Sequence, residues 1–269
     1  MEKFQVVNFE FLEVATQAAL EGGEVLKKYW GHLSHVREKS IEGDLVTEAD
    51  QESEDVIIDL LSKNFPSHKI LSEESGIHEA KNQDYLWVID PLDGTTNYTH
   101  QFPMVAVSIA LFYQDKPLIG VVYNPILNEL FQGVKGQGAT LNQEFIHVST
   151  VSQLKKSLLA TGFAYDRRET KDNNYAEFCH LTNSCQGVRR AGSAALDLSY
   201  VACGRLDGHW EIGLRPWDVA AGALLVEEAG GKVSGFDTQE LDIYARVILA
   251  TNGEIHEQIR AELHQVRSR

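Results

Sequence analysis

Apolar residues recur every three or four positions at the beginning of the chain, which is the spacing of one face of an α-helix. This stripe consists of Phe4, Val7, Phe11, Val14, Ala18, Gly22, Val25 and Tyr29. A second stripe follows Thr47, a residue type that caps helices, and ends near Asn64, just before Pro66. The beginning of the chain therefore predicts two helices separated by a polar loop.

From residue 69 the pattern changes to short apolar runs bounded by turn residues, which is typical of β-strands. The predicted strands are 69–71, 85–89, 105–113 and 118–123, with shorter strands within 131–148. The polar segment 114–117 joins two of these runs and predicts a hairpin turn. This region therefore predicts a mostly antiparallel sheet.

After about residue 150, strand and helix patterns alternate. The predicted strands are 157–163, 187–190, 208–212, 232–236 and 247–250. The predicted helices are 175–183, 194–202, a helix that Pro216 opens and Gly230 closes, and 254–266. We interpret the change as two halves, an α+β half over residues 1–150 and an α/β half over 151–269, packed as one layered body.

The net charge of the chain limits the classes of molecule that it is expected to bind. Lys and Arg number 24 against 39 Asp and Glu, which gives a formal charge of −15, and no basic run occurs. Nucleic acids and anionic membranes are bound through clustered Lys and Arg, so we expect neither as a partner. The first residues lack a basic stretch followed by an apolar one, and the apolar run 104–112 is too short to span a bilayer, so we expect a cytoplasmic protein.

Cysteine and histidine give no metal signature. Cys179, Cys185 and Cys203 are odd in number and lack Cys-x-x-Cys spacing, so we expect reduced, buried thiols. The ten histidines include no His-x-His or His-Glu-x-x-His spacing, so we expect no zinc site.

Carboxylates follow apolar runs at three places in the chain. Asp90 and Asp93 follow the run that starts at Trp87, Glu73 and Glu74 follow Leu71-Ser, and Asp218 follows Pro216-Trp. Carboxylate and backbone carbonyl oxygens are the ligands that Mg²⁺ prefers, and the N–H groups at a helix start favour an anion. The three segments can supply four carboxylates to one pocket, enough for two divalent ions.

Each of these acidic segments also has a plain structural explanation. Asp90 and Asp93 can cap a strand-to-helix corner, Glu73 can lie in a solvated loop, and Asp218 can stabilise a helix N-terminus. Any one segment alone would favour that explanation, and their combination favours the metal pocket.

The motifs resemble those of the inositol monophosphatase family across nearly the whole chain. They are Asp44-Leu-Val-Thr-x-Ala-Asp50, Glu73-Glu-Ser, Asp90-Pro-Leu-Asp-Gly-Thr-Thr-Asn97, Trp217-Asp-Val-Ala-Ala-Gly222 and Glu228-Ala-Gly-Gly231. The segments 189–197 and 204–218 are similar to bacterial members especially. The resemblance implies an α-β-α-β-α sandwich of the inositol monophosphatase and fructose-1,6-bisphosphatase type, built from α+β and α/β halves. It also implies a homodimeric, lithium-sensitive phosphatase with two or three Mg²⁺ ions per site.

The resemblance implies a role for each site residue. The metal ligands would be Glu73, Asp90, Asp93, Asp218 and the main-chain carbonyl of Leu92. Thr95 would hydrogen-bond the attacking water, and Asp50 would accept a proton through Thr95. Asp50 also resembles the carboxylate partner of a capping box with Thr47, and both interpretations can hold at once. Lys39 and Asp44 would belong to a mobile lid, with a plain surface loop as the alternative for Lys39.

The substrate contacts follow from the same resemblance. The N–H groups of Gly94, Thr95 and Thr96 would hold the phosphate oxygens, beside Asp93 and Asp218. Glu211 would accept hydrogen bonds from ring hydroxyls, and Gly192, Ser193 and Ala194 would approach the ring. We expect Arg189, Arg190 and Arg215 to pair with carboxylates structurally, and we assign them no catalytic role.

The leading interpretation is hydrolysis of inositol monophosphate to inositol and phosphate. The alternatives within the superfamily are hydrolysis of fructose 1,6-bisphosphate, a sugar 1-phosphate, histidinol phosphate or 3′-phosphoadenosine 5′-phosphate. Thr96 and Asn97, where histidinol-phosphate and phosphoadenosine phosphatases tend to carry Lys, favour the inositol type. A regulatory protein acting on the transcription machinery is an alternative of another class. An inactive scaffold is disfavoured, because converging carboxylates repel one another without metal.

Overall fold

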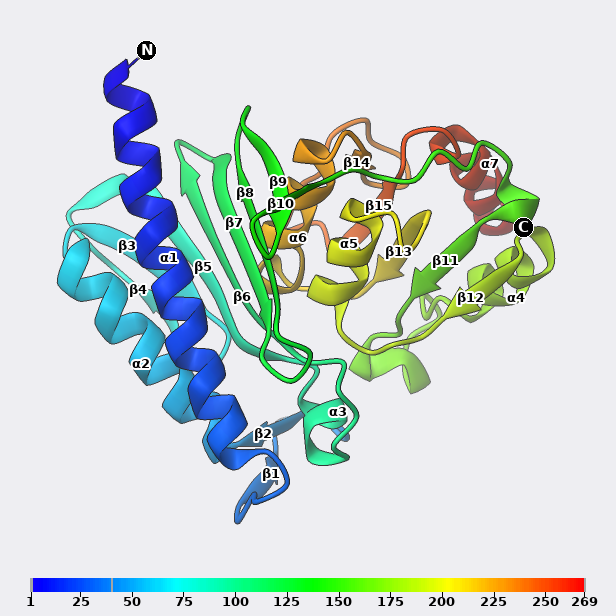
Figure 1. The fold of residues 1–269 in the computed structure, drawn as a ribbon. Coiled ribbons are helices and arrows are strands. Elements are labelled where there is room, and N and C mark those ends of the chain that lie inside the picture. Colours follow the sequence, from blue (N-terminus) through cyan, green and yellow to red (C-terminus); the bar gives the residue numbers. More distant parts are fainter. Residues whose placement is uncertain (1, 40, 269) are drawn as a thin grey trace.

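Five layers of helices and sheets make up the fold (Figure 1). A computed structural model describes residues 2–39 and 41–268, and the side chains of residues 2–8 are not among those described. Phe4 and Val7 of the predicted stripe therefore lie outside the described side chains. The helices are α1 (Glu2–Tyr29), α2 (Glu48–Asn64), α3 (Thr95–Thr99), α4 (Tyr175–Ser184), α5 (Ala194–Ala202), α6 (Pro216–Glu228) and α7 (His256–Arg267), with 3-10 turns η1 (Leu154–Lys156) and η2 (Tyr165–Arg168).

The first layer contains α1 and α2, which cover one face of the larger sheet (Figure 1). The predicted stripe of α1 is confirmed: Phe11, Ala18 and Val25 are buried, and Phe11 and Ala18 belong to the core beneath the sheet. Thr47 caps α2 as predicted, because its side chain accepts a hydrogen bond from the N–H of Ala49.

The second layer is an eight-stranded sheet in the order β10-β9-β8-β7-β6-β5-β3-β4. Its pairs are antiparallel, as predicted, except that β3 runs parallel to β5. The strands are β3 (His68–Ser72), β4 (Gly76–His78), β5 (Asn82–Asp93), β6 (Ala106–Tyr113), β7 (Lys116–Asn124), β8 (Glu129–Val134), β9 (Gly138–Leu141) and β10 (Glu144–Ile146). A separate small hairpin pairs β1 (Val36–Glu38) with β2 (Leu45–Thr47), which the sequence pattern did not predict.

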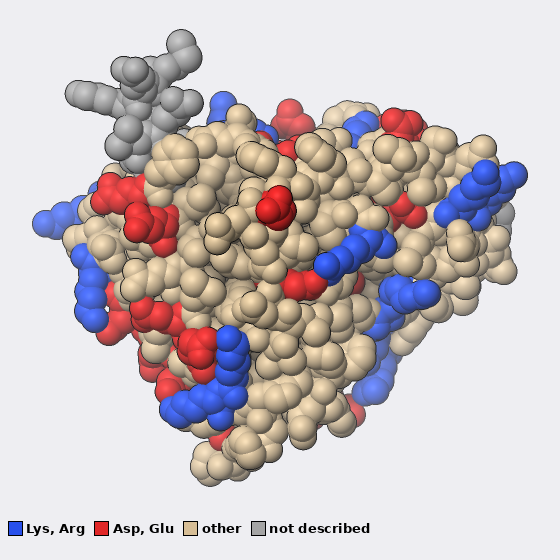
Figure 2. All heavy atoms as spheres, viewed as in Figure 1, with Lys and Arg blue, Asp and Glu red and all other residues tan. Residues whose placement is uncertain are grey.

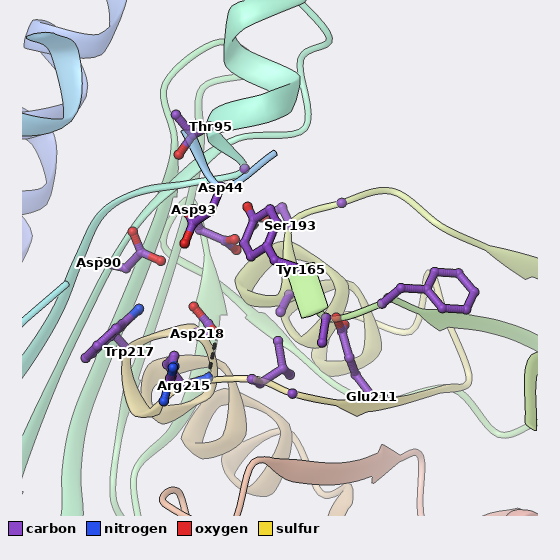
Figure 3. Close-up of a pocket in the computed structure, with 18 of the residues that line it drawn as sticks. Asp44, Asp90, Asp93, Thr95, Tyr165, Ser193, Glu211, Arg215, Trp217 and Asp218 are labelled. Carbon is purple, nitrogen blue, oxygen red and sulfur yellow. Dashed lines mark hydrogen bonds between the residues drawn. The ribbon is translucent and has the colours of Figure 1, made fainter. Parts of the chain in front are cut away.

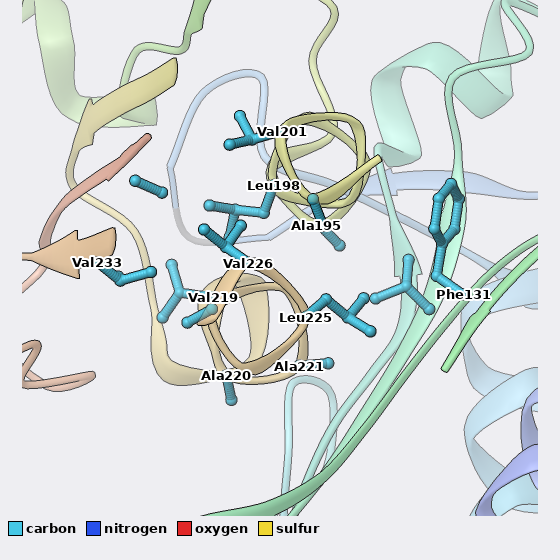
Figure 4. Close-up of a cluster of buried hydrophobic side chains, with 14 of the residues drawn as sticks. Phe131, Ala195, Leu198, Val201, Val219, Ala220, Ala221, Leu225, Val226 and Val233 are labelled. Carbon is cyan, nitrogen blue, oxygen red and sulfur yellow. The ribbon is translucent and has the colours of Figure 1, made fainter. Parts of the chain in front are cut away.

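The middle layer consists of α5 and α6, which pack between the two sheets. Figure 4 shows Leu198 of α5 against Val219 and Val226 of α6, while Leu225 faces Phe131 of β8. The fourth layer is a five-stranded sheet in the order β12-β11-β13-β15-β14, and α4 and α7 form the fifth layer outside it. Its strands are β11 (Leu158–Thr161), β12 (Gly187–Arg189), β13 (Gly208–Ile212), β14 (Lys232–Ser234) and β15 (Val247–Thr251).

The α-β-α-β-α sandwich expected from the resemblance is confirmed. The division at residue 150 remains a prediction, since α6, which lies beyond it, packs on the sheet formed before it. Among the described residues, no helix combines the length and apolar character needed to cross a membrane. On the face drawn in Figure 2, Lys and Arg lie scattered among acidic and neutral side chains.

The prediction of buried thiols is wrong. Cys179 is exposed, and Cys185 and Cys203 are half-buried. Cys179 lies on α4, where Leu181 is fully buried and Cys179 points to the opposite, solvent side of the helix.

Candidate active site

A single cavity of about 310 Å³ opens where the two sheets and the middle helices meet. It is lined by most of the site residues predicted from the sequence, namely Lys39, Asp44, Glu73, Asp90, Leu92, Asp93, Gly94, Thr95, Ser193, Ala194, Glu211 and Asp218. Asp50 lies behind the wall, buried and bonded to Thr95, while Thr96 is exposed and does not line the cavity. Segments more than a hundred residues apart therefore share one site.

An irregularity in β5 delivers two carboxylates to the cavity. Asp90 pairs with Ser108 and Asp93 with Ala106 of β6, so the intervening Pro91 and Leu92 break the regular register. Figure 3 shows Asp90, Asp93 and Asp218 pointing into a common space. Gly94 follows with φ of +94°, a left-handed conformation that strains residues with a side chain, and it starts α3 directly after the strand.

Hydrogen bonds orient each carboxylate. Asp90 Oδ1 accepts from the N–H of Leu92 at 3.0 Å, and Asp218 Oδ2 accepts from the N–H of Arg215 at 2.6 Å. Asp93 Oδ2 accepts from Ser193 Oγ and from the N–H of Ala195, both at 2.7 Å, which joins β5 to the start of α5. Asp90 and Asp218 thus present their second oxygen to the cavity.

Three carboxylates of the cavity, Asp90, Asp93 and Asp218, hold their protons more tightly than free carboxylates do. Burial, followed by the charges of Glu73, Asp93 and Asp218, raises the pKa of Asp90 well above its ordinary value. Burial and the neighbouring charges raise the pKa of Asp218 in the same way. Burial is also the main reason that the pKa of Asp93 rises to about 6.

The donor set fits hard divalent cations. In the part of the chain that the structure describes, no three His, Cys, Asp or Glu side chains gather closely enough to hold one ion by themselves. The carboxylates instead share the cavity, and the ammonium group of Lys39 contacts Glu73 at 2.7 Å and Glu74 at 2.5 Å. Buried carboxylates with raised pKa values are stabilised by a cation, and oxygen-only donors are the type that Mg²⁺ prefers.

Thr95 and Asp50 form a polar pair beneath the cavity. Thr95 Oγ lies 3.2 Å from Asp50 Oδ1 and 3.2 Å from the carbonyl oxygen of Leu92. Asp50 Oδ2 accepts from the N–H and the hydroxyl of Thr47, so Asp50 also completes the capping box of α2. Both interpretations of Asp50 made from the sequence thus correspond to contacts in the structure. Burial raises the pKa of Asp50 to about 6.

Glu211 lies on the side of the cavity opposite α3. It comes from β13, a fully buried strand, and its carboxylate packs on the backbone of Gly162. A Cβ at Gly162 would lie 2.1 Å from Glu211 Oε1, so any larger residue would displace the carboxylate. Ser193, also expected at the substrate, caps α5 and donates to Asp93.

Several residues of the cavity wall carried no role in the sequence interpretation. Tyr165 of η2 projects between Asp93 and Glu211 in Figure 3, and Asp197, Arg190 and Arg246 also line the cavity. The positive charge of Arg190 lowers the pKa of Asp93 and of Glu211, which partly offsets the effect of burial. Arg190 and Arg215 therefore line the cavity, and the expectation that they pair with carboxylates without a catalytic role stays a prediction. Sequence spacing held no signal for Tyr165, because only the fold brings η2 to this place.

Comparisons with known proteins agree with this arrangement. Residues 8–268 match the family described as the inositol monophosphatase family. A Synechocystis protein named Inositol-1-monophosphatase is 53% identical over 253 residues, which cover 94% of this chain and 88% of the relative. The Escherichia coli protein named Nus factor SuhB is 48% identical over 84% of this chain and 85% of its own length.

A solved structure shares the whole fold. The inositol monophosphatase from Anabaena (Nostoc) sp. PCC 7120 superposes with a TM-score of 0.88 at 55% identity, and 96% of each chain is covered. The family match over residues 8–268 spans both sheets and every segment that lines the cavity. The chain therefore belongs to the inositol monophosphatase family, whose members are metal-dependent phosphatases.

Proposed function

We propose that the chain hydrolyses inositol monophosphate to inositol and phosphate, with Mg²⁺ as its cofactor. The observation that carries this proposal is the single cavity that unites four carboxylates, Thr95 and Glu211. Glu73, Asp90, Asp93, Asp218 and the carbonyl of Leu92 would hold two or three ions, which activate water and stabilise the leaving oxygen in such sites.

The chain's own groups would position the reaction. Thr95 Oγ would hydrogen-bond the attacking water, and Asp50, 3.2 Å from Thr95 Oγ, would accept a proton through it. The N–H groups of Gly94, Thr95 and Thr96 at the start of α3 would bind phosphate oxygens, although the Thr96 side chain lies outside the cavity. Lys39 and Asp44 would form a lid, supported by the contacts of Lys39 with Glu73 and Glu74.

The alcohol part of the substrate would lie against Glu211, with Ser193 and Ala194 beside it. A carboxylate only accepts hydrogen bonds, so it can bind two neighbouring hydroxyls of a ring. Substrates without such hydroxyls would lose this contact. We therefore expect Glu211 to make the enzyme prefer polyol phosphates over other phosphate esters.

Two variants test the proposal. Asp93→Asn should abolish Mg²⁺-dependent release of phosphate from inositol 1-phosphate, whereas Asp59→Asn, an exposed change on α2, should retain it. Glu211→Gln should reduce kcat/KM for inositol 1-phosphate by about tenfold or more, while an aryl phosphate loses less than about twofold. Full activity of Asp93→Asn would refute the assignment of this cavity as the active site. An equal loss of kcat/KM for both esters in Glu211→Gln would refute the role of Glu211 in binding the polyol.

A second candidate function is regulation through contact with other proteins, including the transcription machinery. The 48% identical relatives that bear the name Nus factor SuhB favour it. Asp93→Asn distinguishes the two candidate functions. If this variant rescues a strain that lacks the native chain, the chain has a role independent of hydrolysis.

The homodimer, the lithium sensitivity and the cytoplasmic location stay predictions.

A further inference from the structure

A buried histidine lies between two buried carboxylates next to the cavity. His209 Nε2 is 3.5 Å from Glu211 Oε2, and His209 Nδ1 is 3.7 Å from Asp197 Oδ2. His209 and Glu211 alternate with Trp210 on β13, so both side chains project from the same face of the strand toward α5, which carries Asp197. The three ionisable groups thus form a row, and both carboxylates at its ends line the cavity.

His209 and Asp197 have buried polar atoms without a hydrogen-bond partner. His209 is fully buried, and both of its ring nitrogens lack a hydrogen-bond partner, as does Asp197 Oδ1. By contrast His256, another fully buried histidine, bonds Thr251 and Ser234 through its two ring nitrogens. Buried polar atoms are normally paired, so the row around His209 calls for an explanation.

Counting protons supplies the explanation. A neutral imidazole donates through one nitrogen and accepts through the other, so it cannot serve two carboxylates at once. The row is satisfied when its three groups share two protons, with a net charge of −1. The second proton can lie on Glu211 or on Asp197, either of which is then a neutral acid, or on His209, which is then an imidazolium between two carboxylates.

The surroundings disfavour the imidazolium form in the empty site. Burial raises the pKa of both Glu211 and Asp197, and it lowers the pKa of His209 to about 3, so the empty site favours a neutral imidazole with the second proton on a carboxyl group. The other charged groups that face the row are Arg190, Asp93 and Asp218, and Arg190 alone favours ionised Glu211.

We propose that His209 is a positioning residue that takes up the proton of Glu211 when substrate hydroxyls bind, so that Glu211 becomes a charged acceptor without releasing a proton to solvent. The transfer is internal: the O–H bond of Glu211 breaks, an N–H bond forms on His209 Nε2, and Nδ1–H donates to Asp197. This inference rests on the proposed role of Glu211. It adds that recognition of the polyol is insensitive to pH because the row keeps its two protons.

The pH dependence of specificity tests the inference. We compare kcat/KM for inositol 1-phosphate with that for an aryl phosphate between pH 7.0 and 8.5, so that steps common to both esters cancel. In the native chain this ratio should vary less than about twofold. In His209→Phe and in His209→Gln, Glu211 must release its proton to solvent, so the ratio should fall at pH 7 and rise with pH by up to about tenfold per unit. A pH-independent ratio in both folded variants would overturn the proposal.

Two controls separate the possible failures. His256→Gln removes a buried histidine away from the cavity, so it should lower stability and leave the pH dependence of the ratio unchanged. Glu211→Gln tests the proposed function itself: if it does not discriminate the esters, then both proposals fail. If Glu211→Gln discriminates and the His209 variants behave as the native chain does, only the role of His209 fails.

In chains labelled with ¹⁵N-histidine, adding inositol should shift the His209 resonance toward imidazolium, and no shift would contradict the transfer.

Discussion

Asp93→Asn should make the metal-free protein more stable while it removes activity. Asp93 lies among buried carboxylates whose mutual repulsion is relieved only by protons or cations. Asparagine has nearly the same shape, and its side-chain oxygen can still accept from Ser193 Oγ and the N–H of Ala195. The substitution therefore removes a charge and preserves the contacts that join β5 to α5.

The size of the effect follows from the pKa of Asp93. It is about 6 in the folded chain against an ordinary 3.8, so the folded state binds the proton more tightly. Metal-free stability should therefore fall as pH rises from 3.8 to 6 and stay low above it. At 1.36 kcal/mol per pKa unit the loss is about 3 kcal/mol, which the partial exposure of Asp93 to solvent reduces to about 1.5 kcal/mol.

Chemical denaturation in EDTA at pH 5 and pH 8 measures this effect. At pH 8 the free energy of unfolding of Asp93→Asn should exceed that of the native chain by about 1.5 kcal/mol, which corresponds to a rise in Tm of roughly 3–6 °C. At pH 5 the two chains should differ less, and adding Mg²⁺ should stabilise only the native chain. An Asp93→Asn chain that is less stable than the native one at pH 8 in EDTA would refute the reasoning.

Two other substitutions probe separate parts of the cavity. Asp50→Asn should lower kcat for inositol 1-phosphate by about a hundredfold, because it removes the proton acceptor behind Thr95, and steady-state kinetics with Asp59→Asn as control would show it. A loss below about threefold would leave Asp50 with its capping role alone. Gly162→Ala should raise KM for inositol 1-phosphate about tenfold and spare an aryl phosphate, because its Cβ displaces the carboxylate of Glu211. Gly187→Ala on β12, where a Cβ meets no atom closer than 3.4 Å, is the matched control, and an unchanged KM in Gly162→Ala would contradict the placement of Glu211.

Much of the fold could be predicted because its elements bury one regular face. The stripe of α1, the cap of α2 at Thr47 and the hairpin of β6 and β7 depend on contacts close in sequence. The sequence pattern did not predict the hairpin of β1 and β2, because each strand has only three residues and all three residues of β1 are exposed. Such short strands leave no periodic signal.

The candidate site likewise contains residues that the sequence predicted and residues that it did not. The acidic motifs were found because carboxylates after apolar runs are conspicuous, and the family resemblance then linked segments that spacing alone could not. His209 and Asp197 could not be found, because a lone buried histidine gains meaning only from neighbours that come from another element. The same holds for Gly162, whose importance lies in the close approach of Glu211.

The most direct test of the central claim is phosphate release with Mg²⁺ from a panel of esters, each with and without lithium. The panel consists of inositol 1-phosphate, fructose 1,6-bisphosphate, histidinol phosphate and 3′-phosphoadenosine 5′-phosphate. We predict that inositol 1-phosphate is hydrolysed fastest, that removing Mg²⁺ stops the reaction and that lithium suppresses it. Absence of Mg²⁺-dependent release from all four esters would contradict the claim that this cavity is a phosphatase site.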